Sequence, residues 1–278
     1  MSSLNVVLVC LIGAFALAIM VGLWVHWRFR EHSNALGAHS HNDYEQQYPL
    51  TLALRQGFIS VEADVWPVDD QLLVGHEESD LHWDASLRDS YLLPLAELVR
   101  ARGHVLAGLR EPFQLLVDFK ANPERTYLLL DEQLRAFPGL FTYYEREKMR
   151  AGPVSVVVSG NYPRELIAEQ KVRFVACDGR FADVGTGISA SLVPLCSESW
   201  RDHFRWRGHG VMPSEEKREL HRLVRLAHED GRKVRFWGAP RWPAYARRAV
   251  WRELADAHVD YLGADNLVAL RRWGKKMN

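Results

Sequence analysis

The sequence predicts an α/β protein, a (β/α)8 barrel of the TIM type preceded by a single N-terminal transmembrane helix. Short runs rich in β-branched residues alternate with helical patterns along residues 35–265. Eight such runs occur, which is the number of strands in this barrel. No GxGxxG or Walker A loop follows any of them, so the signatures of an open nucleotide-binding sheet are missing.

The composition is that of a globular protein. The 278 residues are 47% apolar and 25% charged, and 35 basic residues balance 35 acidic ones. This balance argues against a disordered chain and against a polybasic nucleic-acid binder. No protein partner is predicted from the sequence. Three cysteines without a CxxC motif exclude a disulfide framework and a zinc ribbon. Cys177 and Cys196 either pair or remain free thiols, and we treat both as small buried hydrophobes.

An apolar leader begins the chain. Val6–Val25 is an unbroken run of apolar or small residues, and no Asp, Glu, Lys or Arg precedes Arg28. A helix of this length spans about 30 Å, the thickness of a bilayer core. A cleaved signal peptide is the alternative, but no basic residue precedes the run. We expect an uncleaved single-pass anchor over residues 1–32 that contacts membrane lipid, with Arg28 and Arg30 favouring a cytoplasmic body.

The body, residues 33–278, is expected to form one barrel domain because no long linker interrupts it. The patterns place its strands at Ala35–His39, Phe58–Asp64, Phe113–Lys120, Val154–Asn161, Arg173–Asp178, Ser191–Ser197, Lys233–Trp237 and Tyr261–Asp265. They place its clearer helices at Pro49–Gln56, Leu93–Arg102, Glu124–Phe137, Arg164–Gln170, Ser214–Asp230 and Tyr245–Ala257.

The second predicted strand carries two acids on one face. Residues i and i+2 of a strand point to the same side, so Glu62 and Asp64 oppose Val61, Ala63 and Val65. The apolar face would pack under the helices and the acidic face would point into the barrel. Two buried carboxylates repel one another unless a cation lies between them. Oxygen ligands suit Mg²⁺, which we favour, or Ca²⁺.

The third strand adds Asp118 and Lys120 at its C-terminal end. Salt bridges to basic residues of the barrel would explain the Glu62/Asp64 pair alone equally well. Asp118 would complete a set of three metal-ligating carboxylates and so favours the metal. Lys120 shares a strand face with Asp118. A lysine beside a divalent cation would hold an anion such as a phosphate group, whereas an Asp–Lys ion pair is the simpler alternative.

Histidines supply candidate acid and base groups. His39 ends the first strand, and His76 follows the segment LLVGHE. A histidine exchanges protons near neutral pH, so two of them beside a metal-held phosphate would suit acid–base catalysis. His41 shares a strand face with His39 and competes with it for this role. Most of the 12 histidines must be structural.

These residues resemble the phosphodiesterase superfamily of glycerophosphodiester phosphodiesterases, phosphatidylinositol-specific phospholipases C and sphingomyelinase D toxins. Its pattern is a histidine after the first strand, an ExD pair, and a second histidine about a dozen residues later. The sequence is most similar to the altered-inheritance-of-mitochondria phosphodiesterase-like family, as seen in AHSHNDY, SVEADVW, LLVGHE, VSGN, CDGR, VRFW and VDYLGADNL.

The resemblance implies a metal-assisted phosphodiester reaction on a (β/α)8-like barrel. It carries over Glu62, Asp64 and Asp118 as metal ligands and His39 and His76 as acid–base residues. It also implies phosphate contacts from Lys120 and Asn161 and a pocket wall at Trp237. Ser40 stands where glycerophosphodiesterases have an arginine, so one phosphate clamp of that branch is missing. Arg180 is a candidate replacement for it.

The sequence therefore predicts a metal-dependent phosphodiester hydrolase that acts on a glycerophosphodiester or on a phospholipid or sphingolipid head group. The main alternative is a membrane-tethered module that binds a phospholipid or phosphoester on the same barrel without turnover. A metal-dependent sugar or aldol enzyme on a similar barrel is a third interpretation, which the pair of histidines disfavours.

Overall fold

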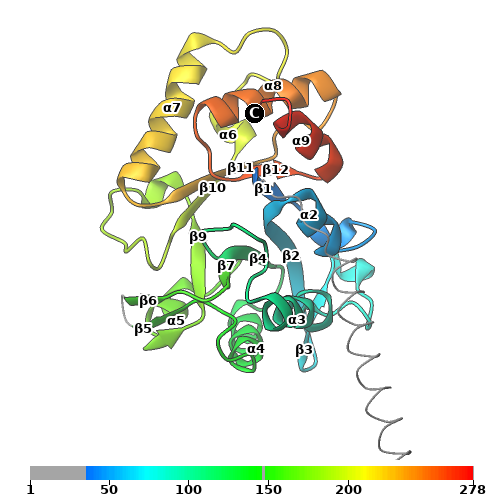
Figure 1. The fold of residues 1–278 in the computed structure, drawn as a ribbon. Coiled ribbons are helices and arrows are strands. Elements are labelled where there is room, and N and C mark those ends of the chain that lie inside the picture. Colours follow the sequence, from blue (N-terminus) through cyan, green and yellow to red (C-terminus); the bar gives the residue numbers. More distant parts are fainter. Residues whose placement is uncertain (1–35, 146–147, 278) are drawn as a thin grey trace, which may run out of the picture.

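The computed structural model describes residues 36–145 and 148–277 as an α/β fold with a nearly closed barrel of eight parallel strands (Figure 1). The strands follow one another around the barrel in the order β11-β10-β9-β7-β4-β2-β1-β12. Their bounds are β1 (Leu36–Ser40), β2 (Phe58–Val68), β4 (Phe113–Phe119), β7 (Val154–Gly160), β9 (Val175–Gly179), β10 (Leu195–Ser199), β11 (Lys233–Trp237) and β12 (Leu262–Ala264).

A single parallel bridge closes the barrel. Arg235 of β11 pairs with Tyr261, the residue just before β12, and the Tyr261 N–H donates to the Val234 carbonyl at 3.2 Å. The first and last strands of the sheet order are thereby joined, as the predicted barrel requires. Side chains from β2 and β11 can then meet across the interior, although four other strands lie between these two in the sheet order.

The remaining strands lie outside the parallel set. β3 (Gln71–Val74) pairs antiparallel with the end of β2, and a separate antiparallel sheet contains β5 (Tyr143–Glu145), β6 (Lys148–Arg150) and β8 (Val172–Arg173). β3 contains the first half of the segment LLVGHE, and its pairing with β2 brings His76, two residues after its end, beside β2.

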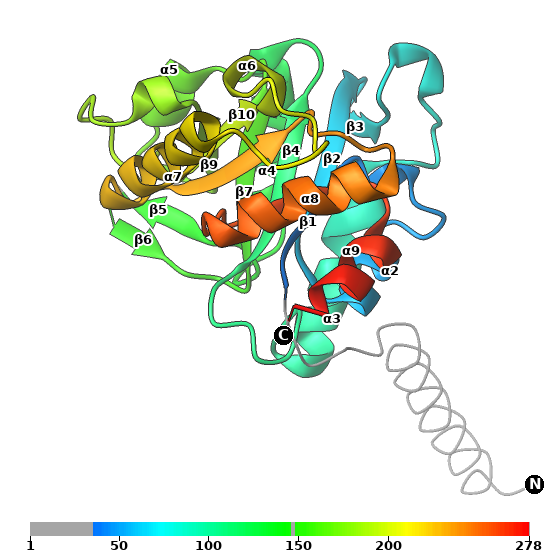
Figure 2. The same cartoon turned by 90° about the horizontal axis from the view of Figure 1, so that it is seen from above.

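Helices cover the outside of the barrel (Figures 1 and 2). The α-helices are α2 (Thr51–Gln56), α3 (Leu93–Arg102), α4 (Pro123–Arg135), α5 (Arg164–Ala168), α6 (Trp200–His203), α7 (Ser214–Glu229), α8 (Ala244–Asp256) and α9 (Leu267–Gly274). Shorter turns are η1 (Asp43–Glu45), η2 (Glu78–Asp80) and η4 (Phe181–Asp183), and η3 (Arg88–Leu92) has π-helical geometry.

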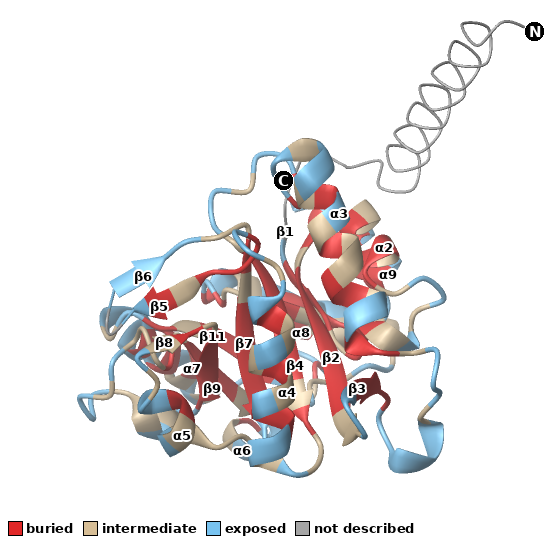
Figure 3. Ribbon diagram, turned by 90° about the horizontal axis from the view of Figure 1, so that it is seen from below, coloured by how far each residue is buried: buried red, intermediate tan, exposed pale blue. Residues whose placement is uncertain are grey.

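The core lies between strands and helices, as Figure 3 shows by the buried residues along the strands and on the inner faces of the helices. Val61, Ala63 and Val65 of β2 are all fully buried in this apolar layer. The predicted alternation on β2 is therefore confirmed, and the opposite face of the strand is left for polar side chains. Cys177 and Cys196 are buried free thiols.

The predicted membrane localisation needs correction. In the part of the chain that the structure describes, no helix is long and apolar enough to cross a membrane. The predicted anchor, Val6–Val25, lies outside the described residues. The absence of such a helix from the described residues contradicts the predicted single-pass localisation, which is not used further. Contact of the anchor with membrane lipid is not shown.

The loop after β1 is held by a buried carboxylate. Asp43 accepts hydrogen bonds from the Ser40 hydroxyl at 2.6 Å, from the Tyr91 hydroxyl at 3.1 Å and from the Leu50 N–H. Leu50 is buried and has a φ of 56°, a conformation that costs a non-glycine residue about 1–3 kcal/mol. Asp43 therefore holds both ends of the segment that carries His41 and Tyr44.

We expect Asp43→Asn to destabilise the protein, because the amide nitrogen cannot accept the bonds that the carboxylate accepts. Leaving buried donors unpaired costs about 1–3 kcal/mol, which is a decrease of several degrees in Tm for a domain of this size, roughly 2–4 °C per kcal/mol. Thermal unfolding measures the effect. Glu97→Gln on the exposed face of α3 is the matched control. An unchanged Tm for Asp43→Asn would contradict the assigned role.

Candidate active site

The three predicted acids meet at the C-terminal ends of β2 and β4. Asp64 and Asp118 are direct neighbours in the register of these strands, and Glu62 lies two residues deeper on β2. Oxygen atoms of the three carboxylates all lie within 4.8 Å of one another. Glu62 and Asp64 are buried, and Asp118 is partly exposed. The spacing read from the sequence thus forms a compact acidic cluster, which we call the acidic triad.

Two cations of the chain balance part of this charge. Lys120 Nζ lies 2.8 Å from Asp64 Oδ2 and 3.7 Å from Asp118 Oδ1. Arg235 of β11 donates from Nη2 to Glu62 Oε2 at 2.7 Å. Burial raises the pKa of the Glu62 carboxyl, but Arg235 and His39 outweigh burial and hold this pKa below its usual range. Burial, and repulsion from the other two acids, raise the pKa of Asp118 to about 6 against the opposing effect of Lys120.

The two oxygens of Asp64 have different surroundings. Oδ2 accepts from the Tyr44 hydroxyl at 2.7 Å and lies 2.8 Å from Lys120 Nζ and 3.0 Å from His76 Nδ1. Oδ1 is also buried, yet it has no hydrogen-bond partner among the described residues. Buried oxygens are rarely left without a partner. A free oxygen in a group of three carboxylates is a suitable donor for a divalent cation, so the residues present fit such an ion.

A glycine makes room for this arrangement. Gly160 ends β7 with a φ of 73°, and a Cβ atom at this position would lie 2.1 Å from Asp118 Oδ1. Any side chain here would displace the carboxylate. The VSGN motif therefore contributes to the site through the absence of a side chain.

His39 of β1 and His41, just after this strand, lie at different depths. His39 is fully buried, with Nδ1 2.7 Å from Ser60 Oγ and Nε2 2.9 Å from Glu62 Oε2. Ser60 Oγ also accepts from Gln114 at 2.9 Å, so its hydroxyl proton is free for His39 Nδ1 and Nε2–H donates to Glu62. Burial and the nearby Arg235 lower the pKa of His39 to about 4, which leaves the ring neutral at pH 7. Both ring nitrogens of His39 are engaged within the barrel.

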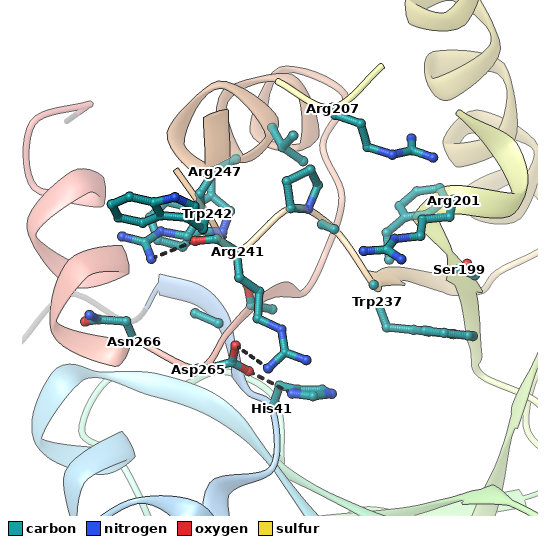
Figure 4. A pocket seen from close by; sticks show the side chains of 18 of the residues that line it. His41, Ser199, Arg201, Arg207, Trp237, Arg241, Trp242, Arg247, Asp265 and Asn266 are labelled. Atoms are coloured by element: carbon teal, nitrogen blue, oxygen red, sulfur yellow. Dashed lines mark hydrogen bonds and ion pairs between the residues drawn. The ribbon is translucent and has the colours of Figure 1, made fainter. Parts of the chain in front are cut away.

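His41 has the accessible position. Its Nδ1 lies 2.8 Å from Asp265 Oδ1, and Arg241 Nη1 lies 3.1 Å from Asp265 Oδ2 (Figure 4). The side chain of His41 is 28% exposed and lines a cavity. The hydrogen bond to Asp265 fixes the orientation of the ring and leaves Nε2 for a ligand. His76, which contacts Asp64 of the acidic triad, is 52% exposed.

The cavity has a volume of about 710 Å³ and opens above β11 and β12. His41 and Arg235 line it, and Arg235 joins it to Glu62 of the triad. Trp237, predicted as a pocket wall, forms part of its lining (Figure 4). Asn161, predicted as a phosphate contact, is exposed and is not among the residues that line this cavity. Arg180 donates to the carbonyls of Gly179 and Ser197.

Several residues of the site were not predicted. Arg235 was missed. It shares one face of β11 with Trp237, whereas the buried Val234 and Phe236 lie on the other face. The alternation rule applied to β11 would have found it. Tyr44 and Asp265 stand in motifs quoted for the resemblance, but no role was assigned to them. Among the other arginines of the cavity, Arg201 lies in the short helix α6, and Arg207 and Arg241 lie in loops, where no periodic pattern marks them. Arg247 lies in α8, within a helix that was predicted, but no role was assigned to it.

The fold and the site together place this protein in the class of (β/α)8-type barrels whose functional site lies at the C-terminal ends of the strands. The site here consists of an acidic cluster, a lysine and accessible histidines. Residues 28–178 match the family described as AIM6-like phosphodiesterase domain. The chain belongs to this family, as the resemblance predicted.

Named relatives agree with this assignment. "Altered inheritance of mitochondria protein 6" from Eremothecium gossypii is 32% identical over an alignment of 266 residues, which covers 84% of this chain and 68% of that protein. The Saccharomyces cerevisiae protein of the same name is 31% identical over 271 residues, with 84% and 70% covered. A homolog from Arthroderma benhamiae is 28% identical, with 84% and 82% covered.

Among solved structures, the chain is similar to a calcium-dependent phosphoinositol-specific phospholipase C from a Pseudomonas species. The TM-score is 0.49 and the identity 14%, over 84% of this chain and 92% of that one.

We expect Gly160→Ala to weaken divalent-cation binding by displacing Asp118. Ca²⁺ and Mg²⁺, added separately, should raise the Tm of the wild-type protein by mass action and raise that of the variant much less. Gly103→Ala is the matched control, because Gly103 has a φ of 77° and a Cβ atom added there would have no neighbour within 4 Å. Both substitutions carry a backbone cost of about 1–2 kcal/mol. Equal stabilisation of the two variants by either cation would refute the assignment.

Proposed function

We propose that this chain is a divalent-cation-dependent phosphodiesterase that acts on a glycerophosphodiester or on a phospholipid or sphingolipid head group. The observation that carries the proposal is the unpartnered, buried Asp64 Oδ1 within a triad of carboxylates beside Lys120. Membership of a phosphodiesterase-domain family supports the reaction class. Mg²⁺ and Ca²⁺ both suit an all-oxygen ligand set.

Glu62, Asp64 and Asp118 would hold the cation. When bound, it would polarise a phosphoryl oxygen and offset the charge that develops there. Lys120 would contact a second nonbridging oxygen, since its ammonium already lies between Asp64 and Asp118. The positive groups around the reacting phosphate would stabilise the transition state more than the ground state.

Two accessible histidines would exchange the protons. His76 and His41 both have exposed ring atoms, and Asp265 orients His41. One would activate the nucleophile, water or a hydroxyl of the substrate, and the other would protonate the leaving oxygen. The role of His39 in proton exchange stays a prediction. Its contacts favour a different task, that of holding the Glu62 carboxylate in place from below.

The first test is metal-dependent hydrolysis. The full-length chain is incubated with a panel of glycerophosphodiesters and lysophospholipids in Mg²⁺, Ca²⁺ or EDTA. We expect cleavage only with a divalent cation. Glu62→Gln should lower kcat/KM at least about 100-fold, because it removes a cation ligand and leaves Arg235 without its carboxylate. Glu97→Gln is the control. If the folded chain binds the cation and a diester yet cleaves none of the panel, the non-catalytic binding module replaces the enzyme.

The second test separates the three histidines. We expect His41→Asn and His76→Asn each to lower kcat by about 10²–10⁴-fold, the usual contribution of general acid–base catalysis. We expect His39→Asn to act mainly through Glu62, so that it raises the cation concentration needed for half-maximal activity. Metal titrations at saturating substrate measure both quantities. A His39→Asn variant with normal cation affinity and a large loss of kcat would return the acid–base role to His39.

A further inference from the structure

The cavity beside the acidic triad contains more positive charge than a phosphodiester needs. Asp265 is the one acidic residue among the described residues that line it. Five arginines line it, namely Arg201, Arg207, Arg235, Arg241 and Arg247. Arg235 is paired with Glu62, and Arg241 is paired with Asp265. Arg201, Arg207 and Arg247 form no ion pair with any carboxylate in the described part of the chain. Three guanidinium groups thus line one cavity without an ion-pair partner among the described residues.

The arginines are held in place by the fold. α6 is anchored by the fully buried Trp200 and carries Arg201 to the cavity. Arg207 donates from Nη1 to the carbonyls of Phe204 and Trp206, which fixes its guanidinium. Gly208, with a φ of 84°, lies against α8 so closely that a Cβ atom would be 2.3 Å from the Ala246 carbonyl oxygen. The loop after α6 therefore has a defined position over the cavity.

The wall across the cavity carries Arg247 of α8. Its Nη1 donates to the Arg241 carbonyl, and its Nε is buried without a partner among the described residues. Figure 4 shows Arg201 and Arg207 on one side of the cavity and Arg247 on the other. Guanidinium groups bind phosphate oxygens by pairs of parallel hydrogen bonds, and a doubly charged phosphate compensates two of them at once.

The position of this cluster relates it to the proposed reaction. His41 and Arg235 lie at the boundary between the triad and the cavity, so a diester at the triad would extend one of its substituents toward the arginines. We infer that the cavity binds a phosphomonoester group of the substrate head group, so that the preferred substrate is a phosphodiester whose polyol head group carries at least one further phosphate. This inference rests on the proposed function and names its substrate class.

The test compares two diesters that differ by one phosphate, glycerophosphoinositol and glycerophosphoinositol 4-phosphate. With the full-length chain and its preferred cation, we expect kcat/KM for the phosphorylated diester to be at least about tenfold higher, as expected for loss or gain of a charge-assisted phosphate contact. The double variant Arg201→Gln/Arg207→Gln should bring the ratio of the two kcat/KM values close to one. Equal values in the wild-type protein, or an unchanged ratio in the variant, would overturn the inference.

Arg205→Gln is the matched control for these variants. Arg205 is exposed, lies between the two tested arginines in sequence, and is not part of the cavity lining. We expect this variant to keep both the Tm and the substrate preference of the wild-type protein. A loss of preference in Arg205→Gln equal to that in the double variant would show a general effect of net charge and would also overturn the inference.

A binding measurement distinguishes failure of this inference from failure of the proposed function. Calorimetric titration of the wild-type chain with inositol 1,4-bisphosphate should give a Kd at least about tenfold lower than titration with inositol 1-phosphate, and the double variant should lose this difference. If neither diester is cleaved but the binding difference is present, the phosphate site stands and the hydrolase proposal falls. If both diesters are cleaved equally and the two inositol phosphates bind equally, the hydrolase proposal stands and the phosphate site falls.

Discussion

The salt bridge between Arg235 and Glu62 connects the closure of the barrel to the assembly of the site. Arg235 lies on β11 and Glu62 on β2, so the two residues meet only when the sheet curls until β11 reaches β12. Removing one partner of a buried ion pair costs about 3–5 kcal/mol, because the other charge is left without compensation. Arg235 neutralises Glu62, the deepest acid of the triad, only when the barrel has closed. The burial of Glu62 therefore depends on that closure.

The charges of the site are separated rather than mixed. The acidic triad occupies the ends of β2 and β4. The arginines of the cavity that form no ion pair among the described residues lie in α6, in the loop after it and in α8. Formal charge over the whole sequence is balanced, so this local separation is not a consequence of composition. A negative cluster beside a positive cavity suits a ligand pair of opposite charge, a divalent cation and a polyanion. Each ligand would reduce the repulsion within its own cluster and attract the other.

Much of the fold follows from local patterns in the sequence. β11 and α3 occupy the predicted residues, and β2, β4 and β7 begin where predicted, because long apolar runs and alternation determine them. The prediction was less accurate where local pattern is weak. β10 begins at Leu195 rather than Ser191, because the chain turns before Pro194. β5, β6 and β8 contain two or three residues each, and β6 is exposed throughout, so no hydrophobic period marks them.

The candidate site could also be predicted only in part, because a local pattern gives the face of a strand on which a residue lies but not its depth in the barrel. Alternation on β2 placed Glu62 and Asp64 on the inner face, and the order of the strands placed Asp118 beside them. Alternation also placed His39 and His41 on one face, but it carries no information on depth. Depth is set by the register of β1 against β2 and β12, which aligns His39 with Ser60 and Gly263, below the level of Glu62.

The arginines of the cavity depend on a still larger part of the structure. Arg201 and Arg247 lie far apart in sequence and line one cavity because α6 and α8 follow the paired strands β10 and β11. Metal ligands on adjacent strands can thus be predicted from a strand-end motif, since register brings them together. A binding site for the rest of the substrate is assembled from loops and helices that follow different strands. Its charge can be assessed only in the folded protein, where Arg235 is paired with Glu62 and Arg241 with Asp265.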